Sequence, residues 1–129
     1  MAITFNHTIV YSADRDAAAA FFTELFGLPP AKDFGRFRAV ELNHGVSLDF
    51  GQAADVEQIS PQHYAFLVSE DEFTAIYGRI RERGLPHWAD PQRQRPDEIN
   101  HHDGGRGVYF ADPSGHYLEI ITRPYGSGG

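Results

Sequence analysis

Three side chains that can bind a metal ion, His7, His63 and Glu119, stand at matching points of an internal repeat. Residues 7–29 read as a histidine, an apolar run, a serine, acidic residues, an amphipathic stretch and Gly-Leu-Pro, and residues 63–86 read the same way. If the two halves pack about a pseudo-two-fold axis, equivalent residues converge on it. Two imidazoles and a carboxylate suit Fe²⁺, Mn²⁺, Zn²⁺ or Ni²⁺ alike and leave coordination positions open for a substrate or oxygen.

The setting of Glu119 strengthens this hypothesis. The segment 117–122 is otherwise apolar, and an unpaired carboxylate buried in it would cost several kcal/mol, so Glu119 needs a partner or a metal ion. The alternation of a strand also allows the side chain to face solvent. Segment 47–50 matches segment 117–120, which places Asp49 at the equivalent point of the first half.

The elements that must position these residues follow the same order in both halves. The first half predicts a strand over 3–11, a helix that begins at Asp14 or Asp16 and ends at Gly27, and strands over 34–42 and 46–51. The second half predicts strands over 64–68, 106–110 and 117–122, and a helix with a Ser69-x-x-Glu72 capping box that ends at Gly84. This βαββ(β) order, written twice, predicts an α+β fold with a mostly antiparallel, curved sheet.

Length and composition limit the class of protein. The 129 residues suit one domain, which we place at 1–125, with modules at about 1–55 and 60–125 and a flexible tail at 126–129. A net charge of −7 argues against nucleic acid, and the absence of cysteine excludes disulfides and sulfur ligands. The chain has neither a membrane-length apolar run nor an export-type leader, so we expect a cytoplasmic protein.

Near its end the chain carries the run Asp112-Pro113-Ser114-Gly115-His116-Tyr117-Leu118-Glu119-Ile120. With His7 and His63, this run resembles the vicinal oxygen chelate superfamily, which includes glyoxalase I, extradiol dioxygenases, fosfomycin-resistance thiol transferases and bleomycin-binding proteins. The resemblance spans 3–122 and implies two βαβββ modules that form an open, barrel-like mixed sheet. It also implies a divalent metal ion held by His7, His63 and Glu119, and a homodimer whose sites are often shared between subunits.

The resemblance leaves the particular member open. Asp49 stands where glyoxalase I members have a fourth ligand, but it is one methylene shorter than glutamate and equally suits a carboxylate beside the site. A phosphonate substrate would need a strongly cationic pocket. The arginines available for one are Arg36, Arg38, Arg93, Arg95 and Arg106.

Aromatic and loop residues are the candidates for substrate contact. Tyr64, Trp88 and Tyr109 could line a cleft for a planar ligand, although core packing also explains Tyr109. The loop 98–106 offers polar groups and two adjacent glycines, and we assign substrate contact and gating to it. Its candidate ligand-binding residues are Asn100 and Arg106. Its candidate proton-transfer residues are His101 and His102.

Two functions follow from these residues. The first is metal-dependent dioxygenase- or lyase-type chemistry on a small organic substrate that binds the metal through its own oxygens. The second is a non-catalytic protein that confers resistance by sequestering an antibiotic or natural product in a dimer cleft. That second protein would need no metal ion.

Overall fold

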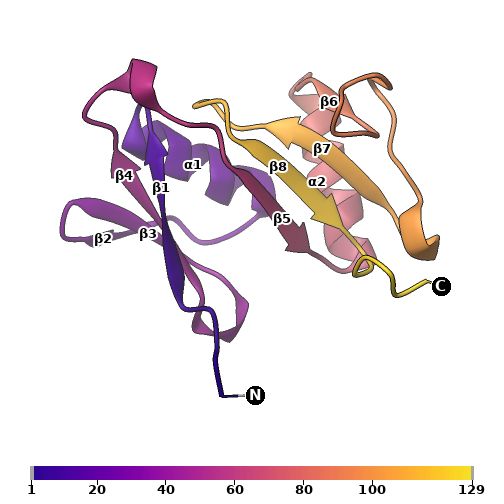
Figure 1. Ribbon diagram of the computed structural model, residues 1–129, viewed down its shortest axis with the longest axis horizontal. Coiled ribbons are helices and arrows are strands. Elements are labelled where there is room, and N and C mark those ends of the chain that lie inside the picture. Colours follow the sequence, from indigo (N-terminus) through magenta and orange to yellow (C-terminus); the bar gives the residue numbers. More distant parts are fainter. Residues whose placement is uncertain (1, 129) are drawn as a thin grey trace. The chain divides into compact units, whose positions relative to one another are not determined.

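The computed structural model describes residues 2–128, and Met1 and Gly129 lie outside the described residues. The chain forms two compact units, Met1–Ser60 and Pro61–Gly129. Each unit follows the order βαβββ, which confirms the α+β fold class and the duplication (Figure 1). None of the helices between residues 2 and 128 is long and apolar enough to cross a lipid bilayer.

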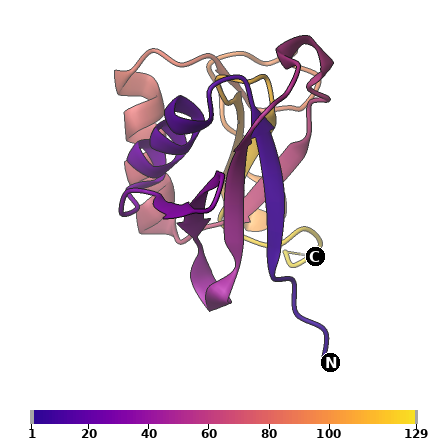
Figure 2. The same ribbon diagram turned by 90° about the vertical axis from the view of Figure 1, so that its left-hand side faces the viewer.

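The described part of the first unit contains one α-helix, two short 3-10 turns and a four-stranded sheet of order β1-β4-β3-β2. Strand β1 runs parallel to β4, and the other two pairings are antiparallel. Figure 2 shows α1 on one face of this sheet. The elements are β1 (His7–Ser12), α1 (Arg15–Phe26), β2 (Lys32–Phe34), β3 (Phe37–Glu41) and β4 (Ser47–Gln52).

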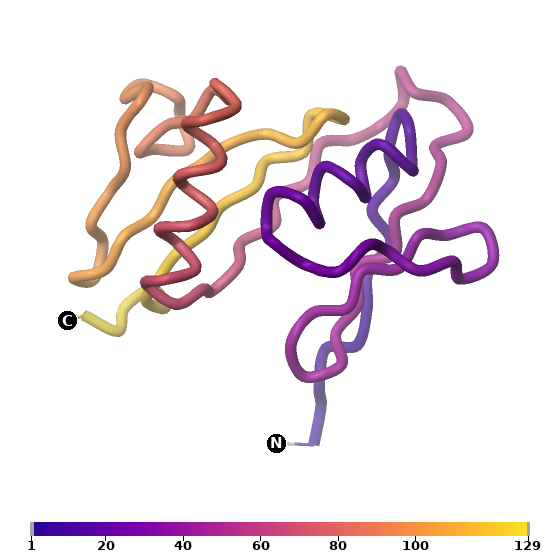
Figure 3. The backbone as a smooth tube through the Cα atoms, turned by 180° about the vertical axis from the view of Figure 1, so that it is seen from behind, coloured from indigo at the N-terminus to yellow at the C-terminus, as the bar shows by residue number. Residues whose placement is uncertain are grey.

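The second unit repeats the arrangement, with a sheet of order β5-β8-β7-β6 and β5 parallel to β8. Helix α2 covers one face of this sheet, as Figure 3 shows from behind. The elements are β5 (His63–Leu67), α2 (Glu70–Glu82), β6 (His87–Trp88), β7 (Gly107–Ala111) and β8 (Tyr117–Ile121). A short 3-10 turn, His102–Gly104, precedes β7.

The predicted starts of both helices and the end of α1 are confirmed, while α2 ends at Glu82, just before the predicted Gly84. Asp14 caps α1 by accepting a hydrogen bond from the Ala17 N–H, and Gly27 ends the helix at φ 71°. Ser69 and Glu72 form the predicted capping box at the start of α2. These local signals are strong because each satisfies backbone groups that a helix end leaves without partners.

Each sheet buries one face against its own helix. Leu25 of α1 and Ile80 of α2 are each 0% exposed. Most of the other buried apolar residues described in the second unit come from α2 and strands β7 and β8, and Ala89 follows β6. They are Phe73, Ile76, Ala89, Val108, Phe110, Leu118 and Ile120.

The strand predictions are wrong in two places. The strand expected over 3–11 begins only at His7, because its partner β4 begins at Ser47 and offers no backbone groups to residues 2–5. The strand expected over 34–42 is instead the end of β2 and all of β3, separated by a turn with Gly35 at φ 59°. The predicted repeat register is correct, because His7 faces Ser47 across β1 and β4 as His63 faces Tyr117 across β5 and β8.

Candidate metal and substrate site

A buried carboxylate and an imidazole meet on the face of the second sheet that α2 does not cover. Strands β5 and β8 are parallel, with His63 beside Tyr117 and Ala65 beside Glu119. Glu119 is 1% exposed, and its Oε1 lies 2.9 Å from Nε2 of His63. The partner that the apolar surroundings of Glu119 require is therefore His63, whose side chain is 51% exposed.

Two tyrosine hydroxyls complete the surroundings of this carboxylate. Tyr125 donates a hydrogen bond to Oε2 of Glu119, and the Tyr125 and Tyr109 hydroxyls lie 3.0 Å apart. Burial raises the pKa of both phenols above the ordinary tyrosine value, and the Glu119 carboxylate raises them further. Both hydroxyls therefore keep their protons and hold the carboxylate with one oxygen toward His63 and the other toward Tyr125.

The segment that carries Tyr125 is hydrogen-bonded to the loop before β7. The Asp103 carboxylate accepts hydrogen bonds from the backbone N–H groups of Gly126 and Gly128, at 3.1 and 3.2 Å. The sequence predicts a flexible tail at 126–129. Residues 126–128 of it are instead attached through Asp103, while Gly129 lies outside the described residues.

Aromatic side chains surround the His63–Glu119 group. Trp88 of β6 faces Tyr109 of β7, and Tyr109 faces Glu119 of β8, so all three side chains point to the same face of the sheet. A narrow cavity of about 30 Å³ lies on this face. Its lining residues are His63, Trp88, Asp90, Pro91, Arg93, Tyr109, Phe110 and Tyr117.

The donor types of His63 and Glu119 fit a divalent metal ion, since an imidazole nitrogen and a carboxylate oxygen already face each other. His7, the third predicted ligand, lies at the start of β1 in the first unit, with its Nδ1 2.7 Å from Oδ1 of Asn6. Among residues 2–128, no three His, Cys, Asp or Glu side chains are grouped closely enough to hold an ion. The structure therefore joins two of the predicted ligands, and the role of His7 stays a prediction.

Asp49 holds the equivalent place in the first sheet. It lies beside Ile9 across β1 and β4, as Glu119 lies beside Ala65. It is 6% exposed, and its Oδ1 accepts a hydrogen bond of 2.6 Å from the Ser47 hydroxyl. A neighbour on its own strand thus satisfies this carboxylate, which favours the interpretation of Asp49 as a structural group.

Two of the predicted substrate residues, Tyr64 and Arg106, point elsewhere. Tyr64 directly follows His63 on β5 and so faces the opposite side of the sheet, where its ring packs against His116. Arg106 donates hydrogen bonds to Glu70 and Thr74 of α2 and lies 4.5 Å above the Phe73 ring. These contacts assign Arg106 to the attachment of α2.

Asn100 is buried in the loop, and its side chain is hydrogen-bonded to the backbone. Its side-chain amide donates to the Ala89 carbonyl at 2.9 Å, and its backbone forms an antiparallel bridge with Gly107. A Cβ at position 107 would lie 2.8 Å from Oδ1 of Asn100, so glycine is required there for the amide to fit. Asn100 therefore holds the loop against β7.

The two predicted proton-transfer histidines are exposed and lie at the 3-10 turn. His102 begins the turn, and its backbone N–H donates to Oδ1 of Asn100 at 3.3 Å. The pKa of Glu70 is lowered, first by a hydrogen bond from Thr122, then by Arg106, and least by the charge of His101. Within residues 2–128, neither histidine is hydrogen-bonded to His63 or Glu119.

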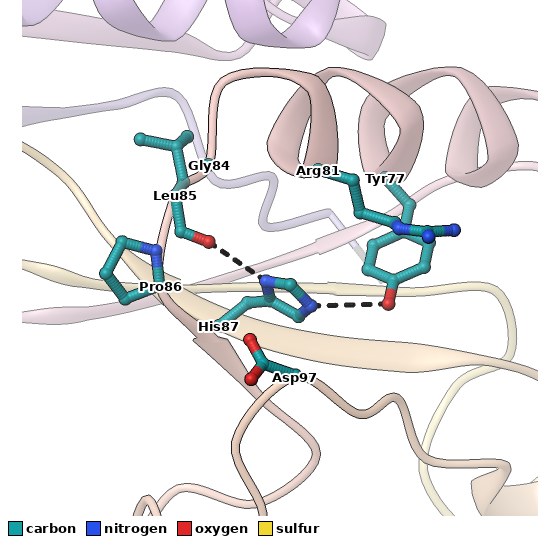
Figure 4. Close-up of a pocket in the computed structure, with 7 residues that line it drawn as sticks. All are labelled: Tyr77, Arg81, Gly84, Leu85, Pro86, His87 and Asp97. Carbon is teal, nitrogen blue, oxygen red and sulfur yellow. Dashed lines mark hydrogen bonds between the residues drawn. The ribbon is translucent and has the colours of Figure 1, made fainter.

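A second hollow, of about 720 Å³, lies at the C-terminal end of α2. In Figure 4, the His87 ring joins the Leu85 carbonyl, at 2.9 Å, to the Tyr77 hydroxyl, at 3.3 Å. Because the carbonyl can only accept, Nδ1 donates to it, and Nε2 is the nitrogen that faces the Tyr77 hydroxyl. Both ring nitrogens of this buried histidine are thus engaged in fixing the chain after the helix.

Sequence reasoning missed Tyr125 altogether and did not place Arg93 and Tyr117. Tyr125 follows the last predicted strand in a segment without periodicity, so no pattern connects it with Glu119. Tyr117 had a usable signal, since it stands two residues before Glu119 and therefore shares its face.

Comparison with known proteins agrees with this geometry. A model of the Glyoxalase/Bleomycin resistance protein/Dioxygenase superfamily matches residues 4–120. The chain belongs to this superfamily. This membership confirms the resemblance to the vicinal oxygen chelate proteins, and the superfamily's chemistry supports a metal-dependent protein without choosing the substrate.

Individual relatives and solved structures differ in their sequence identity to this chain. Metallothiol transferase FosB of Shouchella clausii (strain KSM-K16) is 31% identical over 123 residues, which are 91% of this chain and 78% of that protein. The structure named Oxidase ChaP-H1 is 58% identical, with a TM-score of 0.93 over 97% of this chain and 99% of that one. The structure named Oxidase ChaP-H2 is 57% identical, with a TM-score of 0.95 over the full length of both chains.

Proposed function

We propose that this chain is a metal-dependent oxidase that acts on an aromatic substrate with adjacent oxygens. The observation that carries the proposal is the buried Glu119 carboxylate facing His63 on a sheet face that also bears Trp88 and Tyr109. The likeness to two structures named oxidases, at 57% and 58% identity, supports oxidation over thiol transfer, for which the named relative is 31% identical.

The proposed metal ligands are His63, Glu119 and His7, with His7 supplied by this chain or by a second copy in a homodimer. A divalent ion bound there would polarise adjacent substrate oxygens as a Lewis acid and stabilise developing negative charge. Tyr125 and Tyr109 orient the carboxylate, because their hydroxyls are hydrogen-bonded in series to its second oxygen. Trp88 and Tyr109 provide apolar surface for a planar ring.

Oxygen uptake tests this proposal. The chain, loaded in turn with Fe²⁺, Mn²⁺, Ni²⁺ or Zn²⁺, is mixed with a panel of vicinal dihydroxy aromatics in an oxygen electrode. We expect uptake with at least one redox-active ion and none with Zn²⁺, and we expect Glu119→Gln to abolish it while the folded content is unchanged. Tight binding of the panel without uptake would contradict the proposal and favour the sequestering protein.

Subunit mixing tests the origin of His7. If each site takes His7 from one subunit and His63 with Glu119 from the other, a hybrid of His7→Ala and His63→Ala chains contains one intact site. Such a hybrid should regain about half of the wild-type uptake, whereas sites built within one chain would regain none.

A further inference from the structure

Arg93 stands out among the residues around the cavity beside His63. Its guanidinium carbon lies 4.7 Å from the Trp88 ring centroid and 4.8 Å from the Tyr117 ring centroid. Both rings belong to the face of the second sheet that carries Glu119. Cation–π contacts with two rings hold the charged group at the cavity wall.

The charge of Arg93 is not matched by an acid. Within residues 2–128, Arg93 forms no ion pair, whereas Arg95, two residues further on, pairs with Glu98 at 3.0 Å. Asp90 also lines the cavity, but its carboxylate accepts hydrogen bonds from the backbone N–H groups of Gln94 and Arg95. The chain carries a net charge of −7, yet the Arg93 guanidinium at the cavity wall has N–H donors available for a ligand.

The backbone of Arg93 adopts a conformation that long side chains rarely adopt. Arg93 has φ 62°, in the left-handed region, where a long side chain is unfavourable by about 1 kcal/mol or more. The tight loop holds it there through the hydrogen bonds to Asp90 and through a backbone bond from Ala89 to Arg95 at 3.0 Å. Among residues 2–128, the other non-glycine residues with positive φ are His44, Asp97 and Asp103, whose side chains tolerate this conformation better.

We infer that Arg93 binds an ionised oxygen on the substrate, a carboxylate or an equivalent anionic group attached to the aromatic ring. The inference rests on the proposed function for the aromatic ring and the adjacent oxygens. The cavity of about 30 Å³ has room for a small polar group, and not for a whole ring, beside the guanidinium. Arg93 thus determines specificity: it selects substrates that carry an anionic group in addition to the oxygens proposed to bind at His63 and Glu119.

A pair of probes that differ in one charge tests this inference. Titration calorimetry under nitrogen measures the binding of 3,4-dihydroxybenzoate and of neutral 3,4-dihydroxybenzamide to the full chain, with and without Zn²⁺. We expect the carboxylate probe to bind about tenfold more tightly than the amide, since a hydrogen bond between charged groups at an exposed wall is worth roughly that factor. Arg93→Gln should reduce this ratio to about one.

Two variants separate the charge from its position. Arg93→Lys keeps the charge without the flat guanidinium and should retain part of the ratio, and Arg95→Gln removes a charge from the same loop and should leave the ratio unchanged. Equal affinities in the wild type, no binding of either probe, or a ratio that persists in Arg93→Gln would overturn the inference. If the carboxylate probe binds more tightly than the amide but no oxygen is taken up, only the oxidase proposal is contradicted. If oxygen is taken up but the two probes bind equally, only the role of Arg93 is contradicted.

Discussion

The two units place a histidine and a carboxylate at the same register positions but surround them differently. In the first sheet, Asp49 accepts a hydrogen bond from Ser47 on its own strand. In the second, Glu119 reaches His63 on the neighbouring strand and also accepts from Tyr125. The duplicated backbone thus supplies two equivalent positions, and only in the second does the carboxylate face an imidazole on the neighbouring strand.

The largest expected effects are losses of folding stability, and they should be similar in the two units because the helices occupy equivalent places. Leu25 of α1 and Ile80 of α2 are each 0% exposed. We expect Leu25→Ala and Ile80→Ala each to lower the free energy of unfolding by about 2–5 kcal/mol in urea titrations. Gly78→Ala, on the exposed side of α2 with nothing within 4 Å of a new Cβ, should instead stabilise by about 0.5–1 kcal/mol. A loss below about 1 kcal/mol for either core variant would contradict the equivalence.

A smaller effect should separate the two carboxylates. Tyr125→Phe removes the donor to Oε2 of Glu119, and we expect the Zn²⁺ affinity to fall about tenfold, as is usual when a ligand loses the group that orients it. Ser47→Ala removes the equivalent donor from Asp49 and should leave the affinity unchanged. Competition with a chelating dye measures both. Equal losses in the two variants would mean that the first unit shares the metal site.

The smallest effect concerns the helix starts, which are Arg15 in α1 and Glu70 in α2. Hydrogen bonds from Thr122 and Arg106 lower the pKa of Glu70 below 4.5, so its contribution to stability is present above pH 4.5 and is lost as the pH falls through the lower value. Glu70→Gln should slightly lower the melting temperature at pH 7, and this deficit should shrink as the pH falls below 4.5. A Glu70→Gln deficit that stays constant as the pH is lowered would exclude the charge as its cause.

The repeat explains why much of the fold could be predicted from the sequence. Helix caps depend on neighbouring residues, and the strand register follows from the offset between matching segments, so Asp14, Ser69 and the equivalence of Asp49 with Glu119 were accessible. The first residue of β1 could not be predicted, because strand pairing depends on where β4 begins and not on the alternation of Ile3 and Phe5.

The site was less predictable because it depends on faces and loops. Tyr64 could have been assigned to the opposite face, since it directly follows His63 and successive strand residues alternate. Arg93 and Tyr125 belong to segments without periodicity. The Arg93 guanidinium lies beside the Tyr117 ring, and the Tyr125 hydroxyl lies beside the Tyr109 hydroxyl, which places both residues next to the sheet. Such long-range contacts leave no local pattern in a single sequence.

Metal content tests the central claim most directly. The chain is purified without chelator, incubated with Zn²⁺ and desalted, and its metal is measured by elemental analysis beside His63→Ala, Glu119→Gln and Asp49→Asn. We predict close to one ion per chain in the wild type and in Asp49→Asn, and only background in the other two. Metal retained by Glu119→Gln, or lost equally from Asp49→Asn, would contradict the assignment of the site to the second unit.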